Sequence, residues 1–304
     1  MAQRRTTVEV SGRQLVLSNL DKVLYPASGF TKGEVIDYYA RISTVLLPHL
    51  AGRALTRKRY PDGVEGPSFF EKNAPVHTPP WVRTARLPTP GSTRGREEID
   101  FVVVDELAAL VWLANLAALE LHVPQWRVDA AGRALDADLL VFDLDPGPPA
   151  SIVECCEVAC LLRAALAEDG LDAWAKTSGS KGLQLYVPLE PISSEQTSAY
   201  AKQLAQRLES AHPELVVHRM TRALRPGKVL IDWSQNNAAK TTVAPYSLRA
   251  RALPSVSAPV DWPEVERCER PEDLLFLAPD VLDRVTTAGD LFAPLLLTRR
   301  RLPE

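Results

Sequence analysis

The sequence predicts an α+β fold, and three observations carry that prediction. Between residues 139 and 231, apolar runs of strand length and amphipathic stretches follow the order strand, helix, strand, strand, helix, strand, strand. This order is typical of a split β-α-β sheet rather than a long doubly wound one. The 304 residues are 46% hydrophobic, enough for a buried core in one or two domains. No apolar run reaches the roughly 18 residues of a membrane span.

The first part of the chain is predicted to be mixed and irregular. Residues 8–17 alternate around a Ser-Gly turn, which predicts a hairpin. The capping box Thr31-Lys32-Gly33-Glu34 begins an amphipathic helix expected to stop near Pro48. Residues 99–104 predict a strand. The run 106–121 is apolar almost all round and predicts one deeply buried helix.

The second part has a cleaner rhythm. A capping box at Ser151 and Glu154 begins a helix expected to run to about Asp169, before Gly170. A second helix is expected over 194–211. The strands are expected at residues 139–142, 174–177, 183–189, 215–217 and 229–231.

The charge balance excludes one class of binding. The chain has 35 Lys and Arg against 38 Asp and Glu, a formal net charge of −3. Binding of nucleic acid by bulk positive charge is therefore excluded, and any such binding must use local basic patches. Basic residues do gather at 53–59 and 219–228, whereas acidic residues crowd 264–283. Without a signal-peptide stretch or a C-x-x-C pair, a cytoplasmic protein with reduced thiols is expected.

The sharpest chemical signal is the pair Asp143 and Asp145 at the end of a predicted strand. Residues two apart on a strand project to the same face, so the two carboxylates lie about 7 Å apart while Leu144 turns into the core. Adjacent like charges destabilise a fold unless a cation or donors offset them. The pair therefore predicts a divalent-metal site, and oxygen ligands favour Mg²⁺ or Mn²⁺ over zinc. A strand that simply ends in an Asx turn is the alternative.

Two further segments fit the same device. Residues 177–182 (TSGSKG) lie between two predicted strands and offer glycines, hydroxyls and a lysine to phosphate oxygens, without the spacing of a Walker loop. Asp232 closes another apolar strand before the amide-rich run 234–237. Three carboxylates holding two metal ions beside a triphosphate loop are what two-metal phosphoryl transfer requires. Taken singly, the loop is also typical of a surface turn and the aspartate of a cap.

Eight ordered segments together carry a family resemblance. They are 21–26 (DKVLYP), 31–33 (TKG), 57–63 (RKRYPDG), 69–72 (FFEK), 142–147 (FDLDPG), 178–182 (SGSKG), 232–237 (DWSQNN) and 244–249 (APYSLR). On these segments nearly the whole chain resembles the polymerase domain of bacterial DNA ligase D, in the archaeo-eukaryotic primase superfamily. The resemblance implies a primase-polymerase fold with an RRM-like catalytic sheet and a mixed N-terminal α/β part packed on it.

The same resemblance implies how the chain is organised. Residues 1–304 would form a single catalytic domain. Its N-terminal part, 1–135, would contact DNA and a 5′-phosphate. A metal-binding core would follow over 136–255, and a helical C-terminal segment over 256–304.

The resemblance also implies a role for each motif residue. The implied roles are metal binding by Asp143, Asp145 and Asp232; nucleotide binding by Lys58, His122, Ser178, Lys181, Gly182, Gln184 and Arg249; contact with the 5′-phosphate of a gap by Asn19, Lys22 and Lys32; and stacking on template bases by Phe69 and Phe70. Ordinary structural explanations exist for several of them. An aromatic pair is commonly core, a histidine after a buried helix is commonly structural, and a lysine at a capped helix start is commonly solvated.

One position departs from the family pattern. The family commonly carries histidine where this chain has Gln184. An amide can hydrogen-bond a phosphate but carries no proton or positive charge near neutrality. We therefore expect an altered grip on the triphosphate and an unchanged metal triad.

The expected activity is template-dependent nucleotidyl transfer that fills short gaps or extends primers at DNA breaks, by a two-metal mechanism with Mn²⁺ or Mg²⁺. The resemblance alone implies a preference for ribonucleotides. It also implies gapped or broken 5′-phosphorylated DNA and NTP or dNTP as substrates, a monomer, and work in end joining or excision repair. A separate ligase and a Ku-like end-binding protein are the partners to consider. On DNA the protein would associate with the nucleoid.

Other functions stay open at this point. A primase that makes primers de novo is one alternative. A haloacid-dehalogenase-like phosphatase is another, because residues 140–145 resemble its opening motif, although the run 146–149 (PGPP) replaces the small residues expected there. A non-catalytic DNA-end-binding module is the third, and the retention of all three aspartates argues against it. The chain shows no K-x-D-G adenylation motif, so ligation is not expected from it.

Overall fold

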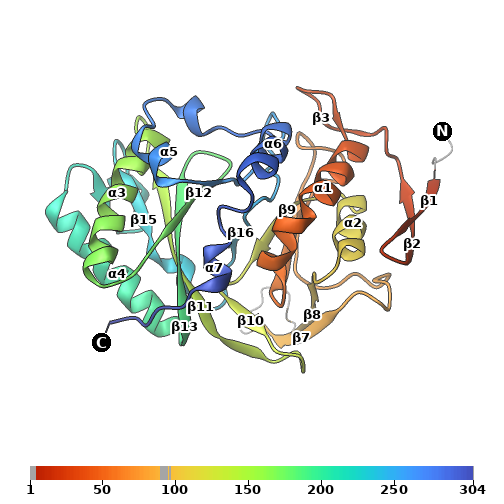
Figure 1. The fold of residues 1–304 in the computed structure, drawn as a ribbon, viewed down its shortest axis with the longest axis horizontal. Helices are drawn as coiled ribbons and strands as arrows, with labels where there is room; N and C mark the ends of the chain where they lie inside the picture. Colours follow the sequence, from red (N-terminus) through yellow and green to blue (C-terminus); the bar gives the residue numbers. More distant parts are fainter. Residues whose placement is uncertain (1–4, 90–94, 96, 304) are drawn as a thin grey trace.

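Two large, mainly antiparallel sheets organise the protein, whose structure is a computed structural model that describes residues 5–89, 95 and 97–303. One sheet carries the three predicted metal-binding aspartates and is called the aspartate sheet here. The other is built mostly from the N-terminal part and is called the N-terminal sheet. Figure 1 shows α3 and α4 beside the first sheet, at the left, and α1 and α2 beside the second, at the right.

The aspartate sheet has the strand order β14-β15-β11-β13-β12-β17, with β10 paired to β11. Its elements are β10 (Trp126–Val128), β11 (Ala134–Pro146), α3 (Ile152–Glu168), β12 (Trp174–Thr177), β13 (Leu183–Ile192), α4 (Ser194–Ala211), β14 (Val216–Val217), β15 (Val229–Asp232) and β17 (Pro259–Val260). The order β15-β11-β13-β12, with α3 after β11 and α4 after β13, confirms the predicted α+β class and split β-α-β sheet. The predicted capping box at Ser151 is present at the start of α3.

The N-terminal sheet has the order β16-β9-β5-β8-β7, with β6 paired to β5. Its elements are α1 (Lys32–Leu50), β5 (Ala54–Arg59), β6 (Phe69–Glu71), β7 (Thr84–Pro88), β8 (Glu98–Val103), α2 (Leu107–Asn115), β9 (Ala118–Val123) and β16 (Thr242–Val243). The capping box predicted at Thr31 begins α1. The helix continues slightly past Pro48 to Leu50, because a proline so near the end removes a single hydrogen bond and the side chain of Leu50 is buried.

The remaining elements lie around these sheets. They are the hairpin β1 (Arg5–Val10) and β2 (Arg13–Ser18), the pair β3 (Val23–Tyr25) and β4 (Phe30–Thr31), the 3-10 turns η1 (Arg222–Leu224), η2 (Trp233–Asn236) and η3 (Pro271–Leu274), and the helices α5 (Trp262–Glu266), α6 (Ala278–Ala288) and α7 (Pro294–Leu297). The hairpin predicted at 8–17 is confirmed. The described helices include none long and apolar enough to cross a bilayer.

The prediction of one buried helix over 106–121 is wrong. The run folds as α2, a turn at Ala117 with φ +57°, and then β9. A continuous apolar run has no period that distinguishes a buried helix from a buried strand, so the pattern could not locate this break. This difference bears on the functional site, because Glu120 and His122 lie two residues apart on a strand and therefore share one face of the sheet.

The alternation of β11 decides which way the aspartates face. Leu140, Phe142 and Leu144 are fully buried in the core formed with α3 and α4. Asp143 and Asp145 alternate with these residues along the strand and therefore face the opposite side of the sheet. Packing of the apolar face onto two helices thus fixes the position of the two carboxylates.

A buried ion pair ties the start of β5 to β11. Arg53 is 2% exposed, and its Nη2 lies 2.8 Å from an oxygen of Asp138. Nη1 of Arg53 donates to the carbonyls of Pro124 and Trp126, at 3.1 Å each. Burial raises the pKa of Asp138, but the charges of Arg53 and Arg127 outweigh it and hold that pKa below its ordinary value.

We expect Asp138→Asn to destabilise the protein by about 3–5 kcal/mol, because it leaves the Arg53 guanidinium buried without its counter-ion. Asp136→Asn, at the exposed start of the same strand, should change little. Since the pKa of Asp138 is depressed in the folded state, its contribution is present above about pH 4 and is lost as pH falls through that lower pKa. Urea denaturation of the variants at pH 7 and pH 3 measures both effects, and equal pH slopes for the two variants would contradict this assignment.

Candidate active site

The three aspartates lie on two adjacent strands of the aspartate sheet. Asp143 on β11 is directly opposite Asp232 on β15, and Asp145 follows Asp143 by two residues on the same face. Directly opposed residues of an antiparallel pair have side chains within contact distance. The fold therefore gathers on one surface three carboxylates that are separated by up to 89 positions in sequence.

The surroundings of Asp143 and Asp145 disfavour the charged form of both carboxylates. Burial, together with the carboxylates of Asp145 and Asp232, raises the pKa of Asp143 to about 7, against a hydrogen bond from Gln184. The pKa of Asp145 is also raised, by burial and by Asp232, while Arg225 and Arg249 oppose the shift. A pair of carboxylates that resists ionisation is the environment that a cation stabilises.

The carboxylate of Asp232 is engaged with the turn that follows it. Its Oδ1 accepts from the backbone N–H and hydroxyl of Ser234, at 3.0 and 2.5 Å, and its Oδ2 accepts from Gln235 Nε2 at 2.8 Å. Within residues 5–89, 95 and 97–303, no group of three or more His, Cys, Asp and Glu side chains is already arranged as metal ligands. The aspartates thus share a surface without forming an assembled ligand group within these described residues.

The predicted phosphate loop is a tight turn between β12 and β13. The hydroxyl of Ser178 accepts from the N–H groups of Ser180 and Gly182, at 3.2 and 3.1 Å. A Cβ on Gly182 would lie 2.1 Å from the carbonyl oxygen of Leu144, so only glycine lets the loop approach β11 this closely. Lys181 is exposed at the tip.

Arg249 connects this loop to the N-terminal sheet. Its Nη1 donates to the carbonyl of Ser178 at 2.7 Å, and its Nε lies 3.4 Å from Glu120 Oε1 on β9. Burial acts to raise the pKa of Glu120, but the hydrogen bond from His122 and the charge of Arg249 lower it to about 2. Glu120 is therefore a buried carboxylate that holds the guanidinium between the two sheets.

The other predicted nucleotide contacts lie on the N-terminal sheet beside Glu120. Lys58 is directly opposite Glu120, and His122 bonds Glu120 Oε2 through Nε2 at 3.0 Å. Burial lowers the pKa of His122, against the favourable charge of Glu120. The ammonium of Lys58 lies 5.3 Å from the ring centre of Phe70. Phe69 and Phe70 are 42% and 53% exposed, so the aromatic pair is not core.

The three residues expected at a 5′-phosphate also come together. The N–H of Lys22 donates to the carbonyl of Asn19 at 3.0 Å, and the N–H of Lys32 donates to the carbonyl of Lys22 at 2.8 Å. The ammonium of Lys32 donates to the carbonyl of Ser18 at 2.6 Å. Burial, with the charges of Lys22 and Arg59, lowers the pKa of Lys32 to about 8. Lys32 is thus a buried cation, unlike an ordinary solvated lysine at a helix start.

Sequence reasoning missed two polar residues of this region. Glu120 was hidden because its segment was predicted as a helix. Lys176 on β12 is fully buried, and it donates to Gln184 Oε1 at 2.5 Å. A lysine in the middle of a four-residue strand, immediately before the phosphate loop, was the available signal for the second.

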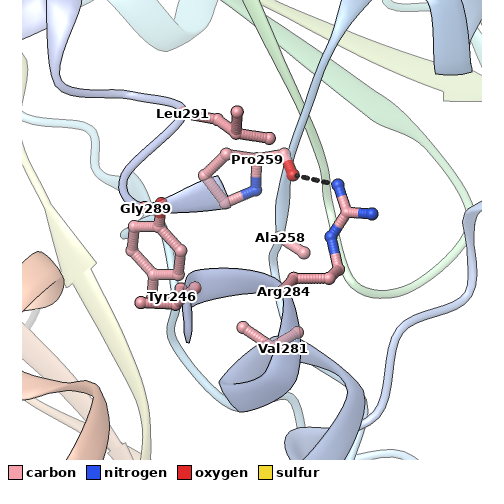
Figure 2. Close-up of a pocket in the computed structure, with 8 residues that line it drawn as sticks. Tyr246, Ala258, Pro259, Val281, Arg284, Gly289 and Leu291 are labelled. Atoms are coloured by element: carbon pink, nitrogen blue, oxygen red, sulfur yellow. Dashed lines mark hydrogen bonds between the residues drawn. The ribbon is translucent and has the colours of Figure 1, made fainter. Parts of the chain in front are cut away.

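A pocket beside β17 has none of these residues in its lining, although Pro259 in that lining is the strand partner of Lys176. It is lined by Tyr246, Pro259, Arg284 and their neighbours, and Arg284 Nη2 donates to the carbonyl of Pro259 at 3.3 Å (Figure 2). None of the residues predicted to bind metal, nucleotide or DNA lines this pocket. The chemistry therefore has to be sought at the aspartates.

Comparisons with known proteins bear on the family. The model of the LigD primase-polymerase domain matches residues 31–292. The multifunctional non-homologous end joining protein LigD of Mycolicibacterium smegmatis is 48% identical over 280 residues, which are 92% of this chain and 36% of that protein. The bifunctional LigD of Bacillus subtilis is 34% identical over 278 residues, which are 91% of this chain and 43% of that protein. The chain thus spans less than half the length of these relatives.

A solved structure gives the same result for the fold. The polymerase domain of Mycobacterium tuberculosis ligase D, in complex with DNA, superimposes with a TM-score of 0.88 at 45% sequence identity. The match covers 94% of this chain and 99% of that one. The fold and the resemblance inferred from the eight motifs are both confirmed. This chain belongs to the LigD primase-polymerase domain family and is accordingly a nucleotidyltransferase.

Proposed function

We propose that this chain is a DNA-repair polymerase that fills short gaps or extends primers at 5′-phosphorylated breaks, with a preference for ribonucleotides. The observation that carries the proposal is the register of β11 and β15, which opposes Asp143 to Asp232 with Asp145 on the same face. Membership in a nucleotidyltransferase family sets aside the phosphatase and the non-catalytic module. The DNA bound to the mycobacterial polymerase domain supports DNA as the partner.

The residues present fit a pair of divalent ions, Mn²⁺ or Mg²⁺. Asp143, Asp145 and Asp232 supply oxygen ligands alone, and the raised pKa of the first two reflects burial and mutual repulsion that Gln184, Arg225 and Arg249 offset only in part. When bound there, such ions would lower the pKa of a primer 3′-hydroxyl and neutralise charge on the departing pyrophosphate.

The other side chains would bind and orient the nucleotide. Arg249 and Lys181 would place positive charge against the triphosphate oxygens, and the Ser178 hydroxyl keeps the loop that contains Lys181 in its turn. Lys58 and His122 would contact the nucleotide near its ribose. Template pairing would select the base, so stacking on Phe69 and Phe70 needs no sequence preference.

Primer extension on a gapped duplex tests the function directly. The substrate is a short gap with a 5′-phosphate on its downstream strand, supplied with NTP or dNTP and with Mn²⁺ or Mg²⁺. The proposal expects templated incorporation, faster with NTP. The same template without a primer separates extension from primer synthesis de novo. Absence of templated incorporation under all four conditions would exclude the proposed function.

At the downstream edge of the gap, Lys32→Ala should weaken the preference for a 5′-phosphate by about tenfold, the size of a lost hydrogen bond between charged groups. Arg41→Ala on the exposed face of the same helix is the matched control. Because the pKa of Lys32 is about 8, protonation is lost between pH 7 and pH 9, and the preference should shrink as pH rises. The ratio of the affinities for gapped DNA with and without the 5′-phosphate measures this preference. A preference that survives in Lys32→Ala would refute the assignment.

The biological setting is also part of the proposal. The relatives are named as end-joining proteins, which supports work in end joining, with excision repair as the other setting. A monomer acting beside a separate ligase and a Ku-like protein is the arrangement we propose. Sedimentation of the chain alone and with gapped DNA tests the monomer.

A further inference from the structure

A row of four polar residues crosses the aspartate sheet at right angles to its strands. Asp232, Asp143, Gln184 and Lys176 are directly opposite one another on β15, β11, β13 and β12. Directly opposed side chains lie on one face and touch their neighbours. The row therefore continues from the aspartates to Lys176, a residue to which neither the motifs nor the resemblance gives a role.

The hydrogen bonds along the row run in one direction. The hydroxyl of Ser257 donates to the carbonyl of Thr177 at 2.7 Å, so it can only accept from Lys176 Nζ, at 2.6 Å. Lys176 Nζ also donates to Gln184 Oε1 at 2.5 Å, and Gln184 Nε2 then donates to Asp143 Oδ1 at 2.9 Å.

The opposite orientation of the amide is disfavoured by its neighbours. A flipped Gln184 would turn its NH₂ group toward the donor Lys176 and its oxygen toward the carboxylate of Asp143. The hydroxyl of Tyr186, which bonds Thr242 Oγ1 at 2.8 Å, can also donate to Gln184 Oε1, at 3.3 Å. The buried lysine thus determines which end of the amide Asp143 meets.

We propose that Lys176 is a positioning residue for nucleotidyl transfer, which acts through Gln184 to hold the Asp143 carboxylate in one orientation. The inference rests on the proposed metal-binding role of Asp143. Lys176 is completely buried in the sheet, where an apolar side chain would cost less desolvation. Unlike an apolar residue, Lys176 supplies a hydrogen-bond donor at a fixed position beside the amide oxygen of Gln184.

A measurement on the metal-free protein tests the orientation of the Gln184 amide directly. In the protein without metal, the side-chain NH₂ protons of Gln184 should be protected from exchange in ¹⁵N NMR spectra. Lys176→Met, which removes the donor and keeps an unbranched side chain, should abolish that protection. Retained protection in Lys176→Met would overturn the proposal.

The functional readouts are kcat, the nucleotide KM and Mn²⁺ affinity by calorimetry. Lys176→Met should lower kcat about tenfold and weaken Mn²⁺ binding about fivefold, the scale of one lost buried hydrogen bond, with KM within about twofold. Thr197→Val, an equally buried polar-to-apolar change in α4 that touches no member of the row, is the matched control and should leave all three unchanged.

A double-mutant cycle decides whether Lys176 acts through Gln184. In a Gln184→Met background, adding Lys176→Met should change kcat by less than about twofold. An equal loss in both backgrounds, or wild-type kcat in Lys176→Met, would overturn the proposal.

If Lys176→Met fails to fold, Ser257→Ala carries the same test, because it frees Nζ from its second acceptor and should lower kcat about threefold. Asp143→Ala separates the hypotheses: retained activity there defeats the proposed function, whereas lost activity with a silent Lys176→Met defeats only this inference.

Discussion

Asp143→Ala is expected to lower templated incorporation by about 10³-fold or more, because a ligand of the proposed metal site would contribute several kcal/mol of transition-state stabilisation and each 1.36 kcal/mol is tenfold in rate. The same loss is expected for Asp145→Ala. Asp136→Ala, on the same strand β11 but exposed, is the matched control and should retain full activity. Single-turnover extension of a gapped primer at saturating NTP measures the chemical step.

The stability of the metal-free protein should move the other way. Burial raises the pKa of Asp143 to about 7, which means that the folded protein disfavours its charged form. Asp143→Asn removes that charge and keeps the shape, so its thermal midpoint in chelator should lie above that of the wild type. Added Mn²⁺ should raise the midpoint of the wild type and leave that of Asp143→Asn nearly unchanged. A variant that loses both activity and midpoint would indicate a merely structural aspartate.

The parts of the fold that depend on local signals were predictable from sequence. The capping boxes at Thr31 and Ser151 define helix starts by side-chain to backbone hydrogen bonds that involve only neighbouring residues. Alternation along β11 set which residues face the core, and so placed Asp143 and Asp145 together. These features need no knowledge of how distant strands pair.

The parts that depend on strand register were not predictable. The row from Asp232 to Lys176 exists because four strands pair in one register, and no local pattern specifies which residues will be opposed. Glu120 was missed for a related reason, since the apolar run that contains it gives no period to separate α2 from β9. Lys176 and Glu120 are both buried, and each also has a partner from a remote segment, Ser257 for the lysine and Arg249 for the glutamate.

Arg249 is where the second large effect is expected, because it joins the two sheets across the proposed nucleotide site. Arg249→Met should raise the KM for NTP about 10- to 100-fold, the scale of lost hydrogen bonds to a charged group, with a smaller change in kcat. The guanidinium is only partly exposed and is fixed by Ser178 and Glu120, so its charge reaches the triphosphate without a large ordering cost.

Arg251→Met is the matched control for this prediction. Arg251 bonds the hydroxyl of Ser180 in the same loop but is exposed, so loss of its charge should change the KM by less than about threefold. Steady-state extension over a range of NTP concentrations separates the two constants. If Arg251→Met and Arg249→Met raise the KM equally, the effect depends on the total positive charge near the loop and not on the position of Arg249. A selective rise in Arg249→Met instead assigns the effect to the partly buried guanidinium that Ser178 and Glu120 hold in place, which exposed Arg251 lacks.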